Sequence, residues 1–146
     1  MKKSDGSIKD VVLAAIQRNT AGLIGTLRTR IWDEGDPATV AKLQAAVPLG
    51  DGERPILYAY FDASNWTLVT TRRVCYSLGG HVGAVAASEI ASVNPGDFKG
   101  LRGQQCDCLT IRSRDGQTHR CPFETGGASM GTLYAVMTLC KVTSAA

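Results

Sequence analysis

The amino-acid sequence predicts an α+β fold, in which N-terminal helices precede a strongly bent antiparallel sheet, or open barrel, of about seven strands capped by a C-terminal helix. Before residue 48 the apolar residues recur at helical spacing. Between residues 56 and 123 they occur in short runs bounded by turn residues, and after Thr125 they return to helical spacing. The period changes at Leu49-Gly50-Asp51-Gly52, so we expect a helical extension over residues 1–50 and a sheet domain over residues 51–146.

Three helices are expected in the extension, and the first two are marked mainly by apolar stripes. Ser7 and Asp10 are expected to cap the first helix. Its stripe consists of Ile8, Val11, Val12, Ala15 and Ile16. The second helix covers Thr20–Trp32, although Gly22 and Gly25 each cost about 1 kcal/mol relative to alanine in a helix.

The third helix has the clearest boundaries. Asp36 is a typical N-cap residue, Pro37 suits the first helical position, and Pro48 ends the segment. Its apolar residues are Val40, Leu43 and Val47.

The stretch Trp66–Leu78 predicts the central hairpin of the sheet. Side chains alternate between the two faces of a strand, so the loop length decides which residues share a face. A three-residue connection, Thr70-Thr71-Arg72, places Leu68 opposite Val74 and Trp66 opposite Tyr76 on one apolar face. A two-residue loop would instead place Leu68 opposite Cys75. We therefore expect the three-residue loop, with Trp66, Leu68, Val74 and Tyr76 in the core.

The remaining strands are short and separated by turn residues. They are expected at Ile56–Phe61, His81–Ala87, Ile90–Val93, Cys106–Arg112 and Thr118–Phe123. The last two are joined by a loop that contains Asp115-Gly116, a typical hairpin turn. The closing helix has an apolar stripe of Met130, Leu133, Tyr134 and Met137, continued by Leu139 or Cys140.

Composition excludes several classes of protein. The chain of 146 residues suits one hydrophobic core, and its net charge of +3 is spread along the sequence, unlike the concentrated basic face of a nucleic-acid binder. No apolar run reaches the length of a membrane helix, and no apolar segment follows the N-terminal lysines as in a signal peptide. Five cysteines, an odd number at irregular spacing, indicate a reduced cytoplasmic protein.

A succession of motifs resembles the bacterial pleckstrin-homology-like (PH-like) domains. It comprises Gly52-Glu53-x-x-Ile56-Leu57, the hairpin Trp66-Thr67-Leu68-Val69-Thr70-x-Arg72-Arg73-Val74-x-Tyr76, Ser88-Glu89-Ile90-x-x-Val93, the Asp115-Gly116 turn and the closing helix. The resemblance covers about residues 52–141. It implies a seven-stranded, bent antiparallel sheet capped by one helix, and a domain that binds a protein, a peptide or a lipid without catalytic residues.

Cysteine and histidine side chains are the candidates for metal or nucleophilic chemistry. They are Cys75, Cys106, Cys108, Cys121, His81 and His119. Cys106 and Cys108 are separated by one residue instead of the two typical of structural zinc sites, so we expect no metal and no cofactor. His119 and Cys121 share a face of one strand, but no known nucleophile motif surrounds them, so we expect no catalysis.

The candidate partner-binding residues lie in two places. Arg72 and Arg73 are expected at a solvated turn, with Glu89 as a salt-bridge partner. The second place is the glycine-punctuated loop Asp97–Gly103, with Phe98, Lys99, Leu101 and Arg102. In the lipid-binding relatives, basic residues near the first strand pair hold phosphate, whereas here the first loop, Asp62–Asn65, is acidic and polar.

We therefore expect a non-enzymatic recognition protein that binds and neutralises another protein, as bacterial immunity proteins do with their toxins. The alternative is a membrane-surface module that binds anionic lipid.

Overall fold

The computed structural model describes residues 3–20, 28–96, 99, 106–126 and 129–144. It has three α-helices, α1 (Asp5–Thr20), α2 (Pro37–Ala46) and α3 (Ser129–Ser144), and two short 3₁₀ helices, η1 (Trp32–Glu34) and η2 (Ala87–Glu89). The strands are β1 (Thr29–Ile31), β2 (Pro55–Asp62), β3 (Asn65–Thr70), β4 (Arg73–Leu78), β5 (His81–Ala86), β6 (Ile90–Asn94), β7 (Cys106–Ser113) and β8 (Thr118–Glu124). The predicted α+β class with antiparallel strands is confirmed.

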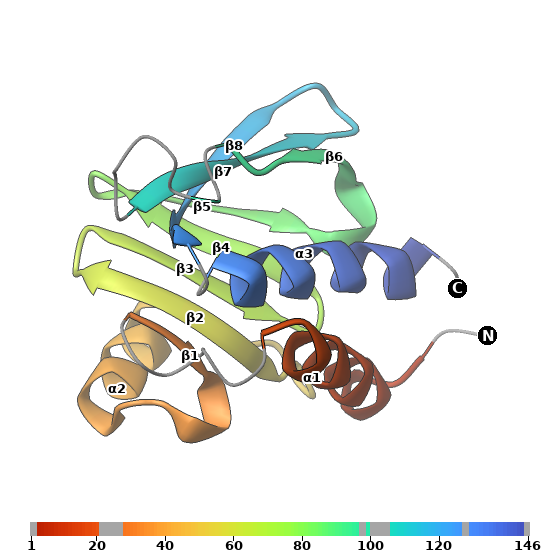
Figure 1. Cartoon of the computed structure of the whole chain (residues 1–146), viewed down its shortest axis with the longest axis horizontal. Helices are drawn as coiled ribbons and strands as arrows, with labels where there is room; N and C mark the ends of the chain where they lie inside the picture. Colours follow the sequence, from red (N-terminus) through yellow and green to blue (C-terminus); the bar gives the residue numbers. More distant parts are fainter. Residues whose placement is uncertain (1–2, 21–27, 97–98, 100–105, 127–128, 145–146) are drawn as a thin grey trace.

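The strands form two antiparallel sheets (Figure 1). Five strands are ordered β1-β2-β3-β4-β5, and three are ordered β6-β7-β8. Helices α1 and α3 pack side by side, and α2 lies apart from them (Figure 1). None of the helices in the described ranges is long and apolar enough to cross a membrane.

Two hydrophobic clusters cover opposite faces of the five-stranded sheet. The larger cluster joins α1, α3, the inner face of the three-stranded sheet and side chains such as Leu57 and Val69. The smaller one packs Leu43 and Val47 of α2 against Tyr58, Trp66 and Leu68. The central strands of this sheet are therefore buried on both faces.

The predicted register of the β3–β4 hairpin is wrong by one residue. Val69 pairs with Val74, Leu68 with Cys75 and Trp66 with Ser77, so the connection has two residues, Thr71 and Arg72. The prediction assumed a single apolar face, but both faces are buried. Trp66 and Leu68 thus lie in the smaller cluster and Val74 in the larger one, with Tyr76 packed against the latter.

The helices of the first fifty residues follow the sequence prediction only in part. Helix α1 begins earlier than expected, and the Ser4 hydroxyl, not that of Ser7, accepts the N-terminal amide hydrogen bond at 3.2 Å. The Asp36 cap of α2 is confirmed, because its carboxylate accepts the Thr39 N–H at 3.0 Å. The helix expected over Thr20–Trp32 is wrong at Thr29–Ile31, which form β1; residues 21–27 lie outside the described part of the chain.

Strand β1 is positioned by a partner far away in the sequence. It pairs with β2, and the buried Glu124 at the end of β8 accepts hydrogen bonds from Thr29 N–H at 3.0 Å and from Thr29 Oγ1 at 2.7 Å. Elements from both sides of the turn at residues 49–52 therefore share one sheet and one core.

Candidate functional site

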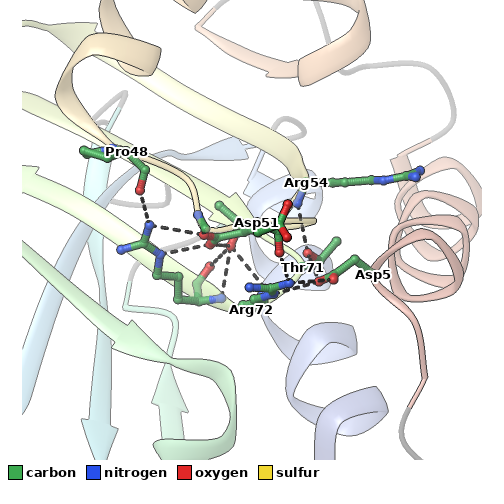
Figure 2. Close-up of polar contacts among 10 residues, drawn as sticks. Asp5, Pro48, Asp51, Arg54, Thr71 and Arg72 are labelled. Atoms are coloured by element: carbon green, nitrogen blue, oxygen red, sulfur yellow. Dashed lines mark hydrogen bonds and ion pairs between the residues drawn. The ribbon is translucent and has the colours of Figure 1, made fainter.

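The predicted arginines lie at the turn between β3 and β4, where they are surrounded by acidic groups (Figure 2). The Thr70 hydroxyl accepts the N–H groups of Arg72 and Arg73, both at 3.1 Å, which fixes this two-residue turn. The two arginine side chains then reach different carboxylates.

Arg73 pairs with Glu53, whose side chain is only 3% exposed. Its Nε lies 2.9 Å from Glu53 Oε2 and its Nη2 lies 3.2 Å from Oε1. The same carboxylate accepts the Thr70 hydroxyl at 2.6 Å and the Gly50 N–H at 2.9 Å. Burial alone would raise the pKa of Glu53, but these hydrogen bonds outweigh it and hold the pKa below its usual value.

Arg72 pairs with Asp5 at the start of α1. Its Nε lies 3.1 Å from Asp5 Oδ1 and its Nη2 lies 2.9 Å from Oδ2, a bidentate contact (Figure 2). The Thr71 hydroxyl also donates to Asp5 at 2.6 Å. The hydrogen bond from Arg72 holds the pKa of the Asp5 carboxyl below its usual value. The turn and the helix are thereby fastened together.

These contacts change the role expected of the arginines. Their salt-bridge partners are Asp5 and Glu53, not the expected Glu89. A cleft of about 660 Å³ opens beside this network and is lined by Lys3, Asp5 and Arg72, of which Asp5 and Arg72 compensate each other's charge. The network therefore fits a structural role better than an anion site.

The second predicted place lies largely outside the described residues. Phe98, Leu101 and Arg102 lie outside the described residues, whereas Lys99 is described and exposed. The share of this loop in partner binding stays a prediction.

The buried cysteines lack the features of a nucleophile. Burial raises the pKa of the Cys75 thiol to about 11 and that of Cys121 still further, so both are protonated at neutral pH. His119 Nδ1 lies 2.8 Å from Tyr76 Oη. Within the described ranges, no group of three or more His, Cys, Asp or Glu side chains is arranged to hold a metal ion.

Helix α3 borders two grooves on the protein surface, at residues that were not among the predicted site residues. A groove of about 450 Å³ separates α3 from β6, and another of about 520 Å³ lies between α3 and α1. Met137 and Lys141 line both grooves and, with their neighbours Tyr134 and Thr138, form what we call the α3 ridge. Met137 is 49% exposed.

The charged residues along the α3 ridge are all basic. Arg114 and Lys141 line the groove beside β6, whereas Arg18 and Lys141 line the groove beside α1. Val11, which is 39% exposed, adds apolar surface to the second groove. An apolar strip with basic flanks is suited to a partner segment that is apolar on one side and acidic on the other.

No known protein family, curated protein or solved structure matches this chain.

Proposed function

We propose that this protein is a non-enzymatic recognition module of PH-like fold that binds another protein and neutralises it, as bacterial immunity proteins do with toxins. The observation that carries the proposal is the α3 ridge. Among the described residues it holds Met137, one of three large apolar side chains that are exposed, and Val11 lies across the adjoining groove. Exposed apolar surface beside basic groups is typical of protein-binding sites.

The order of the strands supports the PH-like part of the proposal. After the turn at residues 49–52, four strands (β2–β5) join one sheet, three strands (β6–β8) form a second, and α3 follows. The family resemblance implies the same count of seven strands and one capping helix. α1, β1 and α2 are additions to that plan on the N-terminal side.

The electrostatics favour a protein partner over a membrane. A lipid phosphate needs uncompensated basic residues near the first strand pair, whereas here Arg72 and Arg73 are paired with Asp5 and Glu53. The protonated thiols of Cys75 and Cys121 also argue against cysteine catalysis.

The test uses the protein encoded beside this one in its genome, which the proposal predicts to be a toxin. Titration calorimetry should show a stable complex with the natural chain and an affinity at least about tenfold lower for Met137→Glu, which places a carboxylate in the middle of the ridge. Gln44→Glu is the matched control, because Gln44 is also an exposed helical residue, on α2. Its affinity should be unchanged.

Two outcomes would contradict the proposal. Equal affinity of Met137→Glu and the natural chain would exclude the α3 ridge as the binding surface. Co-sedimentation with anionic vesicles at low salt, without binding of the neighbouring protein, would favour the lipid-binding alternative.

A further inference from the structure

Strand β5 forms an outer edge of the five-stranded sheet that lacks the usual protection. The other edges in the described part of the chain have such protection. β1 has three residues, β6 contains a bulge between Ile90 and Ser92, and β8 carries Pro122. β5 has six residues, HVGAVA, with no proline, no bulge against β4, and no Lys, Arg, Asp or Glu.

The pairing of β4 with β5 determines which backbone groups face the open edge. The two strands are joined by Gly79 and Gly80, both with positive φ (59° and 87°), and the pair Leu78–His81 closes this two-residue turn. Backbone hydrogen bonds in an antiparallel pair alternate, so residues 81, 83 and 85 bond to β4. The next odd residue, Ala87, also bonds to the β4 side, through the Arg72 carbonyl at 2.9 Å.

The N–H and C=O groups of Val82, Ala84 and Ala86 therefore point away from β4. No described strand pairs with that side of β5. The side chains of the same three residues are exposed, and Val82 is 67% exposed, the highest value among the large apolar residues described. Unpaired backbone groups next to small apolar side chains form a template for another strand.

We propose that a second copy of this chain pairs with this edge, β5 against β5 in antiparallel orientation about a two-fold axis at Ala84. This register places Ala84 opposite the partner subunit's Ala84, and Val82 opposite the partner subunit's Ala86. In this register each N–H group at the open edge lies opposite a C=O group of the partner strand, and each C=O group lies opposite an N–H group. The two five-stranded sheets join into one continuous sheet.

The composition of the strand favours a second copy as the occupant. In an isologous interface each side chain meets a side chain of the same strand, so a charged strand would oppose like charges. β5 has no such charge, and the side chains around the axis are small. A single strand pair buries less surface than a standard interface, so we expect a dimer with a dissociation constant in the micromolar range or weaker.

The test is sedimentation equilibrium of the full chain from micromolar to near-millimolar concentration. The natural chain should shift from monomer to dimer as the concentration rises. Ala84→Pro removes an N–H that faces the open edge and leaves the bonds to β4 in place, whereas Ala84→Thr keeps that N–H. The proline variant should remain monomeric and the threonine variant should dimerise.

Val82→Lys provides a second variant that does not alter the backbone, in case Ala84→Pro fails to fold. It adds a charge at the open edge and should weaken dimerisation at least tenfold while thermal unfolding stays unchanged. In hydrogen exchange, the amides of Val82, Ala84 and Ala86 should become protected as the concentration rises. A natural chain that stays monomeric, a Val82→Lys variant that dimerises normally, or protection confined to the α3 ridge would each overturn the proposal.

Discussion

The turn that precedes β4 and the strand β5 that pairs with β4 differ in how their polar groups are satisfied. The β3–β4 turn carries two arginines, and each one is held by a carboxylate and a neighbouring carbonyl, that of Asp51 for Arg72 and that of Pro48 for Arg73. Strand β5 shows no charge, yet its outer backbone groups and Val82 face solvent. The charged groups of the β3–β4 turn, which we call the closed region, thus find their partners within the protein. The uncharged edge of β5, which we call the open region, leaves its outer backbone groups to solvent.

We infer from this difference that the residues that stabilise the fold are distinct from those proposed to bind partners. The charges that attract attention in the sequence fasten α1 and the turn at residues 49–52 to the sheet. The surfaces that we propose for partners lie at β5, with its small side chains, and on the α3 ridge around the exposed Met137. Substitutions at the closed region should therefore change the free energy of unfolding, and substitutions at the open region should change association.

The largest effect at the closed region is expected for Glu53→Gln. Removal of the buried negative charge leaves Arg73 without its counter-ion, and because Arg73 is 30% exposed we expect a loss of about 2 kcal/mol in the free energy of unfolding, measured by urea denaturation. Glu89→Gln is the matched control, since Glu89 is exposed. A change in dimerisation of Glu53→Gln would show that the two regions are coupled.

The same carboxylate gives a dependence on pH. Because the pKa of Glu53 is lowered in the folded protein, its charge stabilises the fold fully above about pH 4.5, the ordinary value, and this contribution is lost as the pH falls through the lower pKa of the folded state. The difference in stability between the natural chain and Glu53→Gln should therefore shrink in acid. A difference that is constant from pH 7 to pH 3 would contradict the assignment.

A smaller loss is expected for Thr67→Val, which tests the contact between the sheets. The buried Thr67 hydroxyl donates to the Pro122 carbonyl at 2.6 Å, and valine keeps the shape while it removes the donor. The free energy of unfolding should fall by about 1 kcal/mol. Thr118→Val, at an exposed position of β8, should leave it unchanged.

The smallest effect is expected for Arg72→Gln. The Arg72 side chain is 45% exposed, so its pair with Asp5 is screened by water and by salt. The melting temperature should fall slightly at low salt, and the difference from the natural chain should disappear at high salt. A difference that persists in high salt would mean that the pair acts as a buried one.

Local patterns in the sequence were sufficient to predict most elements of the fold. The Asp36 cap and the Asp115-Gly116 turn each act within a few residues, and the structure has them as expected. β1 could not be predicted in the same way, since its position depends on Glu124, which lies 95 residues away in the sequence. The predicted hairpin register was wrong because it required the apolar residues to share one face, whereas α2 covers the second face and both faces are buried.

The candidate site was harder to predict than the fold. Arg72 was identified as notable, but its partner Asp5 is 67 residues away and no local pattern links them. Met137 and Leu133 belong to one apolar stripe of α3, yet Leu133 is buried together with Val136, Leu139 and Val142, whereas Met137 is exposed. Tertiary packing therefore decides which residues of an apolar stripe are buried.

The placement of the first fifty residues also has a consequence for folding kinetics. During synthesis α1 (residues 5–20) emerges long before α3 (residues 129–144), the helix on which it packs, and Thr29 of β1 emerges 95 residues before its partner Glu124. Contacts between such distant segments close long loops and slow folding. The apolar side of α1 therefore lacks its contact with α3 until translation reaches residues 129–144.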